Sequence, residues 1–414
     1  MSPRTARPAP DYGEIGRRIR TIRRRRGLSL DTAAGLAGIS KPYLSQIETG
    51  ARRVSRRGLL EDIASALGCS VVDLTGEPYV PVDGPSATAL ATIPPIQLAL
   101  LDCDLDDVPD QRPRPLADLE LAVRDANRHR DHTRYELAGR ELGQLLVELQ
   151  ITAATGDESE RRRALTALVE AGIVAYEMTK NLGHPQLAVE AARRGLDAAR
   201  RLGDPTLLGF ARWYYALALM RLGSRRRAAG TLSSAVDDLA SVADPTANQT
   251  LSAEVYGLLH ITSALEAARS GRADDAWAHV AEARSIADRT GERNSLLMHF
   301  GPTNVTAWSL AVGVELGEGA AAIERAHRTP VDLTVFDSAN RVAAWHFDHA
   351  RAYAQEDGRC DLEAIRYLDT AERTAPQRLH HDPIARELLL ELDGRLRTRV
   401  WELGSLRHRF GVSA

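Results

Sequence analysis

Apolar residues recur at intervals of three and four along most of this chain, which is the spacing of amphipathic helices. Residues 11–76 contain several short stretches of this kind, separated by turns that hold glycine. From residue 116 onward the spacing continues with almost no strand-like alternation, and it breaks at short loop signals: 182–185, 202–205, 222–224, 270–272, 316–318 and 357–359. The pattern predicts an all-α protein.

The breaks in the long C-terminal part suggest a repeat. Gly183, Gly223, Gly271, Gly317 and Gly358 are 40, 48, 46 and 41 residues apart, and at each a helix ends and a second amphipathic helix follows. This period exceeds the 34 residues of a tetratricopeptide repeat. It predicts an α-solenoid of tetratricopeptide-like hairpins with a concave binding face, and an irregular helical bundle is the alternative.

A proline-rich stretch separates the two helical regions. Residues 77–115 hold eight prolines and leave room for one short helix at about 96–102. We therefore expect three parts: a small domain at 11–76, a linker with a short helix at 77–115, and a helical repeat domain at 116–414.

Charge is divided unevenly between these parts. The 414 residues carry a net charge of −3, but residues 1–76 hold fourteen Lys and Arg against seven Asp and Glu. A basic head on an acidic body suggests a polyanion partner for the head alone, and a solvated basic helix is the alternative.

The remaining composition favours a cytosolic protein. The three cysteines lie far apart, so neither a disulfide framework nor a zinc site is expected. The first ten residues lack the apolar core of a secretion signal, and no apolar run is long enough to span a bilayer.

The most informative segment is 27–67. Ser29 is placed to cap one short helix, Gly38 allows a tight turn, and Ser40 is placed to cap the next helix. In that second helix, Leu44 and Ile47 share the side that faces the core. Lys41, Pro42, Ser45 and Gln46 share the opposite side. A helix that packs its apolar side against the core and exposes a polar, basic side is the arrangement used in helix-turn-helix DNA recognition.

These residues resemble the Cro/repressor-type (XRE) helix-turn-helix family. Its pattern is matched at Leu28, Ser29, Ala34, Gly38, Ser40, Ser45, Ile47, Glu48, Gly50, Arg52, Ser55, Leu59, Ile63, Ala64, Ala66 and Leu67. Three positions depart from it: Leu30 stands where a phosphate-binding Gln is common, Ala33 replaces a usual Leu, and Val54 replaces a usual Pro. The resemblance implies a five-helix domain that binds double-stranded DNA as a homodimer on an inverted repeat.

The resemblance also implies roles for single residues. Lys41, Pro42 and Gln46 would face base edges, because Lys can donate to guanine and Gln can pair with adenine. Tyr43, Ser45, Arg52 and Arg53 would contact phosphates. The expected DNA-binding set is completed by Arg20 of the arginine-rich first helix and by Ser29 and Ser40, whereas Glu48 and Gly50 are expected to be structural.

The whole arrangement resembles regulators of high-GC Gram-positive bacteria that join such a head to tetratricopeptide-like hairpins and are associated with development and secondary metabolism. The stretch Phe300–Val305, followed by Trp308 and Glu315, resembles a recurrent mark of that group. We expect Phe300, Asn304, Trp308 and Arg341 to contact a signalling peptide or small molecule. The alternative is that Asn304 braces a local turn and that Trp308 belongs to the core.

Catalytic patterns are missing from the sequence: it has no phosphate loop, no GxSxG elbow and no HExxH pair. We therefore expect no enzymatic activity, no metal and no cofactor. The leading hypothesis is a transcriptional regulator whose repeat domain, residues 116–414, dimerises and senses a signal by binding a peptide, small molecule or protein partner. The competing hypothesis is a protein-interaction scaffold, or an antitoxin-like protein, whose DNA binding serves autoregulation.

Overall fold

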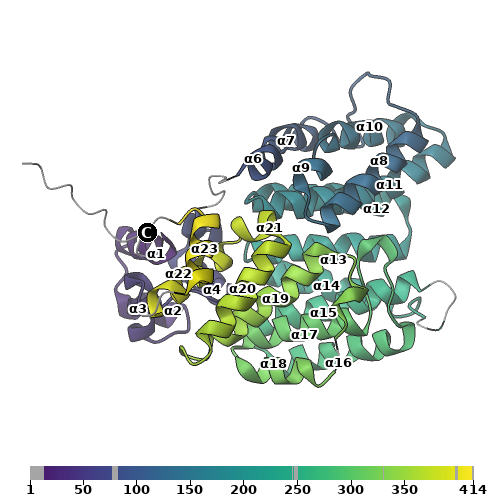
Figure 1. Cartoon of the computed structure of the whole chain (residues 1–414). Helices are drawn as coiled ribbons and strands as arrows, with labels where there is room; N and C mark the ends of the chain where they lie inside the picture. Colours follow the sequence, from purple (N-terminus) through teal and green to yellow (C-terminus); the bar gives the residue numbers. More distant parts are fainter. Residues whose placement is uncertain are drawn as a thin grey trace, which may run out of the picture.

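The chain folds into helices throughout the part that the computed structural model describes, residues 14–76, 83–244, 246, 250–329, 331–396 and 400–412. Within these ranges no residue lies in a strand, so the all-α prediction is confirmed. The predicted domain limits at residues 11–13, 77–82 and 413–414 lie outside the described residues. A small N-terminal head sits at one end of a larger helical body (Figure 1).

Five short helices form the head: α1 (Glu14–Arg25), α2 (Leu30–Leu36), α3 (Lys41–Thr49), α4 (Arg57–Leu67) and α5 (Val71–Thr75). Ser29 accepts a hydrogen bond from the Thr32 amide, and Ser40 accepts one from the Tyr43 amide, so both predicted caps are present. Gly38 has φ +68°, which glycine adopts without a steric penalty and which closes the turn between α2 and α3.

The segment after the head differs from the prediction of one short helix. It contains two helices, α6 (Gly84–Ala91) and α7 (Ile93–Leu101). Pro94 and Pro95 do not prevent α7, because they occupy its first turn, where amide protons have no partner within the helix. Ile93 and Ile96 are buried in the main core of the body, so much of this segment belongs structurally to the body.

The body continues through α8 (Leu116–Asp131), α9 (Tyr135–Ala138) and α10 (Leu142–Thr155) into stacked helical hairpins. The described hairpins are α11 (Glu158–Asn181) with α12 (Pro185–Leu202), α13 (Pro205–Arg221) with α14 (Arg225–Leu239), α15 (Leu251–Arg269) with α16 (Ala273–Thr290), α17 (Pro302–Leu316) with α18 (Ala320–His327), and α19 (Ala339–Ala354) with α20 (Asp361–Thr374). The six predicted breaks all separate helices, and the glycine at each has a positive φ. Two 3₁₀ turns, Ser295–Leu297 and Leu333–Val335, lie in the longer connections.

Small residues allow the hairpins to pack closely. A Cβ on Gly195 in α12 would lie 1.8 Å from the Tyr214 hydroxyl oxygen, and one on Gly172 in α11 would lie 3.0 Å from the Gly195 Cα. Tyr214 itself is fully buried and donates to the Val169 carbonyl at 3.2 Å. Glycine is therefore required where α11, α12 and α13 meet.

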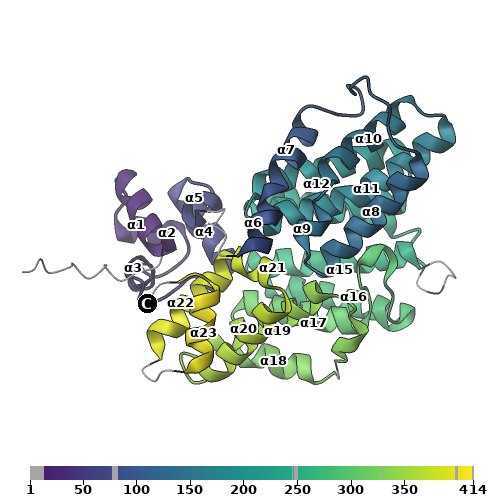
Figure 2. The ribbon, with the colours of Figure 1, turned by 45° about the horizontal axis from the view of Figure 1, so that its top comes forward.

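The chain then returns to the head through α21 (Pro376–His380), α22 (Pro383–Arg395) and α23 (Trp401–Arg409). These helices, drawn in yellow, lie beside the purple head (Figures 1 and 2). One cluster of buried apolar side chains contains both head residues such as Leu60 and C-terminal residues such as Leu388.

The two ends of the solenoid also touch each other. The Tyr135 amide after α8 donates to Gln377 Oε1 at 2.9 Å, and Ser338 Oγ at the start of α19 donates to Asp131 Oδ1 at 2.7 Å. These contacts close part of the concave face.

Candidate functional site

The outer face of α3 is the first candidate site. Leu44 and Ile47 are each 2% exposed and hold the helix against the head, while Lys41, Pro42 and Gln46 are exposed to solvent. Pro42 falls in the first turn, which a proline can occupy. A helix that is held by its apolar side and exposes its polar side to solvent can enter a major groove.

The other predicted DNA-binding residues of α1 to α3 are at least partly accessible to solvent. Arg20, Ser29 and Ser40 are exposed, and Tyr43 and Ser45 are half-buried. The hydroxyl groups of Ser29 and Ser40 already accept hydrogen bonds from helix amides, but both residues remain exposed to solvent. Their contact with DNA stays a prediction.

The two arginines after α3 are held by the body. Arg52 Nη2 lies 2.8 Å from Asp357 Oδ1 in an exposed pair, and its guanidinium lies 5.8 Å from the Tyr43 ring centroid. The side chain of Arg53 is 10% exposed and lies 3.8 Å from Glu387 Oε2. The expected contact of Arg53 with phosphate stays a prediction; in this arrangement of head and body its side chain lies against α22.

Polar contacts hold α4 against the body. Arg225 at the start of α14 donates to Glu61 at 2.7 Å, to Asp62 at 2.7 Å and to the Gly58 carbonyl at 2.6 Å. Arg57 forms an ion pair with Asp382. The head is thus fixed through the helix next to the one that presents the polar face.

A buried carboxylate links α4 to the inside of the body. Glu315 in α17 accepts from the Gly58 amide at 3.3 Å and from Arg351 at 2.9 Å, and Arg351 also donates to the Ser55 carbonyl at 3.1 Å and 3.2 Å. Burial alone would raise the pKa of Glu315, but Arg351 and Arg269 lower it to about 2. This carboxylate is therefore ionised at neutral pH.

A cavity of 210 Å³ lies at the centre of the body. Its walls come mainly from α11, α13, α15, α17 and α19, and three of the predicted ligand residues, Asn304, Trp308 and Arg341, line it. Asn304 is 2% exposed and donates from Nδ2 to the Met298 carbonyl at 3.3 Å. The guanidinium of Arg341 lies 5.6 Å from the Trp308 ring centroid. The structure brings these three residues together.

Phe300, the fourth predicted ligand residue, does not line this cavity. It is 1% exposed, and a Cβ on Gly257 would lie 2.0 Å from its ring. Phe300 therefore belongs to the core, where it packs α15 against the chain that leads into α17. Sequence spacing alone gave no means of separating it from its neighbours.

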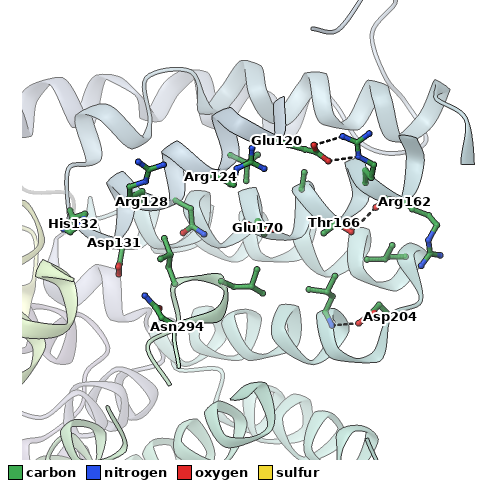
Figure 3. Close-up of a pocket in the computed structure, with 18 of the residues that line it drawn as sticks. Glu120, Arg124, Arg128, Asp131, His132, Arg162, Thr166, Glu170, Asp204 and Asn294 are labelled. Atoms are coloured by element: carbon green, nitrogen blue, oxygen red, sulfur yellow. Dashed lines mark hydrogen bonds and ion pairs between the residues drawn. The ribbon is translucent and has the colours of Figure 1, made fainter. Parts of the chain in front are cut away.

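A second, larger hollow of 830 Å³ lies on the other side of the segment that precedes α17 (Figure 3). Arg124, Arg128, Glu170 and Asn294 line it, together with Asp131, which also lines the central cavity. This groove could not be predicted from the sequence, because its walls come from distant stretches around residues 120–132, 162–170, 202–207 and 294–297 and from Asp337. Its mixed charges select no single type of ligand.

The segment between the two hollows has an unusual backbone. Leu296, Leu297 and His299 all have positive φ, at 55°, 54° and 52°, which costs residues other than glycine about 1–3 kcal/mol each. His299 Nε2 lies 2.7 Å from Asp131 Oδ2, and this contact helps to fix the segment against α8. Several of the residues that shape the cavity are thus held in strained positions.

One residue of the head also lines the cavity. Arg57 lies there beside Glu315 and Arg351, the residues that hold α4. No pattern in the sequence singled out Arg57 or Arg351, whereas Glu315 followed the stretch Phe300–Val305 that had been singled out. In the described ranges, no group of three His, Cys, Asp or Glu side chains is arranged to hold a metal ion. Within those ranges no helix has the length and apolar character to cross a bilayer.

Known proteins resemble this chain most clearly at its head. Residues 14–75 match the family described as helix-turn-helix domain. The HTH-type transcriptional regulator DdrOP3 of Deinococcus deserti is 46% identical over 57 residues, which are 14% of this chain. The chain spans 43% of the length of that relative.

Two solved structures resemble the chain more distantly. Bacillus thuringiensis PlcR, in complex with the peptide PapR7 and DNA, is 14% identical with a TM-score of 0.25, covering 66% of this chain and 94% of PlcR. The apo form of ComR from S. thermophilus is 12% identical with a TM-score of 0.25, covering 89% of this chain and 97% of ComR. Scores this low support no inference about the body. The head is assigned by its own residues and by the family match: residues 14–75 form a helix-turn-helix domain.

Proposed function

We propose that this chain is a cytosolic, non-enzymatic transcriptional regulator of the XRE type, which binds an inverted-repeat operator as a homodimer and whose body binds a signal. The observation that carries the proposal is the exposed polar face of α3, with Lys41, Pro42 and Gln46 above a fully buried apolar face. A helix-turn-helix domain uses this face for base readout.

Each residue of this face has a distinct proposed role. Lys41 donates to guanine and Gln46 pairs with adenine, so both determine sequence preference. Arg20, Tyr43, Ser45 and Arg52 contact the sugar-phosphate backbone, which supplies affinity and positions the head without selecting sequence.

In the proposed coupling, the same residues contact the signal in the cavity and hold the head in place. Arg57, Glu315 and Arg351 line the cavity and also hold α4. A ligand in the cavity therefore changes the surroundings of the residues that fix the head. It regulates DNA binding to the extent that it binds the docked and released arrangements with different affinity.

Binding to the DNA upstream of the protein's own gene tests the first half of the proposal. Fluorescence anisotropy at a series of salt concentrations should give an affinity that falls steeply with salt, since log K falls by about 0.9 per log unit of salt for each phosphate neutralised. Gln46→Ala should reduce the discrimination between operator variants by about 1–3 kcal/mol at one base pair per half-site.

Gln97→Ala is the matched control, because Gln97 is an exposed glutamine on α7 of the body. It should leave both affinity and sequence ranking unchanged. Should Gln46→Ala rank the operator variants as the unaltered protein does, the proposed recognition face is wrong. Should no genomic DNA be bound at low salt, the proposed function fails.

A further inference from the structure

The central cavity carries more positive than negative charge. Eight of its lining residues are Arg or Lys and five are Asp or Glu. Each of these five carboxylates already has a cationic or hydrogen-bonding partner in the protein: Asp131 with His299, Glu177 with Arg130, Glu315 and Asp348 with Arg351, and Asp382 with Arg57. The excess charge therefore belongs to cations that no protein carboxylate neutralises at contact distance.

Arg341 and Arg378 are the cations left over. Among the residues that the structure describes, neither guanidinium has a carboxylate oxygen within 4.0 Å; Arg378 donates to the Asn340 carbonyl at 2.5 Å, and Arg341 faces the Trp308 ring. Burial lowers the pKa of Arg341, and the nearby charge of Arg378 lowers it further. Both side chains are half-buried, and two cations close enough to repel each other are costly to hold together unless an anion joins them.

A third cation experiences the same excess charge. Lys180 in α11 lies 3.8 Å from Glu177 Oε1, but Glu177 also pairs with Arg130 and accepts from Asn340 at 2.7 Å. Burial, together with Arg378 and Arg341, lowers the pKa of Lys180 to about 8 even though Glu177 raises it. Glu177, which Lys180 shares with Arg130, therefore does not balance the positive charge on this wall of the cavity.

Neutral polar groups beside these cations are also incomplete. Asn304 Oδ1, Asn340 Oδ1 and Trp308 Nε1 are buried and have no hydrogen-bond partner in the described part of the protein. Asn304 and Asn340 are 2% and 4% exposed. Buried polar groups in folded proteins normally find partners, so three unpaired atoms on residues that line one cavity point to a site for a polar group.

The rest of the lining limits what such a site binds. Apolar side chains, among them Trp213, Leu217, Leu258 and Trp345, also line the cavity. The volume of 210 Å³ is below the range of about 300–1,000 Å³ that is typical of sites for drug-sized ligands. The occupant is therefore small and has an apolar part.

We propose that the cavity binds a compact organic acid, whose carboxylate is held by Arg341 and Arg378 and whose apolar part packs against Trp308. This inference rests on the proposed function and names the chemical class of its signal. A guanidinium pair fits a carboxylate because its N–H groups match the two oxygens. The C-terminus of a peptide presents the same carboxylate, so the test must separate the two sources.

The test compares acids with their uncharged amides on the full chain without DNA. Three pairs serve as probes: hexanoate with hexanamide, phenylacetate with phenylacetamide, and N-acetyl-leucine with N-acetyl-leucinamide, all at one ionic strength. At a tenfold excess over Kd, at least one acid should raise the melting temperature by about 1–2 °C more than its amide does. Inorganic phosphate, which lacks an apolar part, should raise it less.

Variants show whether the acid binds at this cavity. In calorimetry, Arg341→Gln should raise the Kd of the active acid at least tenfold. Arg341→Lys keeps the positive charge but loses the paired N–H donors of the guanidinium, so it should raise the Kd less. Because Arg341→Gln removes an unpaired charge, its ligand-free melting temperature should equal or exceed that of the unaltered protein. Arg226→Gln, at an exposed site on α14, is the matched control and should bind the acid normally.

Two results would overturn the inference. In one, no acid exceeds its amide, or Arg341→Gln binds the acid as tightly as Arg226→Gln does. In the other, a four-residue alanyl peptide ending in leucine binds and all three small acids fail, which would assign the site to a peptide C-terminus. Because binding is measured without DNA, either result leaves operator binding untouched, whereas failure of the proposed function appears only in the DNA assay.

Discussion

Arg23 shows how one side chain in the head can be structural although its neighbours on the same helix face solvent. It is 7% exposed, and its Nε and Nη2 donate to the two oxygens of Glu48 at 2.5 Å and 2.8 Å. Its Nη1 donates to the Leu28 carbonyl at 2.8 Å. One guanidinium therefore joins α1, the α1–α2 turn and the end of α3, so that it sets the angle of the recognition face.

Arg23→Ala should lower the free energy of unfolding of the head by about 3–5 kcal/mol, because it leaves the Glu48 carboxylate buried without a partner. This free energy can be measured by urea unfolding in which hydrogen exchange of the α1 and α3 amides is monitored. Arg24→Ala, at an exposed arginine one position later, should change the same quantity by less than about 0.5 kcal/mol. Equal effects of the two substitutions would show that the pair is not structurally important.

At the scale of elements, close helix packing rather than helix propensity decides which glycines are needed. Gly195 in α12 and Gly230 in α14 both lie inside helices, where glycine is less favourable than alanine by about 1 kcal/mol. A Cβ on Gly195 would collide with Tyr214, whereas a Cβ on Gly230 would meet nothing within 4 Å. The same substitution should therefore have opposite signs at the two sites.

Gly195→Ala should destabilise the body by about 1–3 kcal/mol, because Tyr214 has to move and its hydrogen bond to Val169 is strained or lost. Gly230→Ala should stabilise it by about 0.5–1 kcal/mol. Urea unfolding monitored by circular dichroism compares the two variants directly. A destabilised Gly230→Ala together with a neutral Gly195→Ala would contradict this account of the α11–α12–α13 junction.

How much the sequence predicted depends on the range of the contacts involved. The caps at Ser29 and Ser40, the turn at Gly38 and the breaks between hairpins are local, and they were predicted correctly from single residues and spacing. The Arg23–Glu48 pair, the covering of Arg53 and the two hollows involve residues far apart in the chain, and spacing carries no information about them. The α7 helix was placed only approximately, because Pro94 and Pro95 predicted a break where they in fact start a helix.

On the scale of the whole molecule, the contact between head and body uses a residue that is also proposed to bind DNA. Arg52 is proposed to contact phosphate, but in this structure it pairs with Asp357, which follows α19. One guanidinium cannot satisfy both partners at full strength. The docked arrangement therefore competes with the phosphate backbone for Arg52, and release of the head would return this cation to DNA.

Asp357→Asn should raise the affinity for every DNA sequence alike by about 1.5–5-fold, because an exposed ion pair contributes about 0.2–1 kcal/mol. The side chain is a suitable one to change: Asp357 has φ +51°, a conformation that Asn also tolerates well, so the loop should keep its shape.

Anisotropy titrations with operator and with random DNA measure the change in affinity. Asp118→Asn, at an exposed acid on α8, controls for the loss of one negative charge. The gain should disappear in an Arg52→Ala background, since the released cation is then missing. If Asp357→Asn and Asp118→Asn raise the affinity equally, the effect is one of net charge, and docking does not compete with DNA through Arg52.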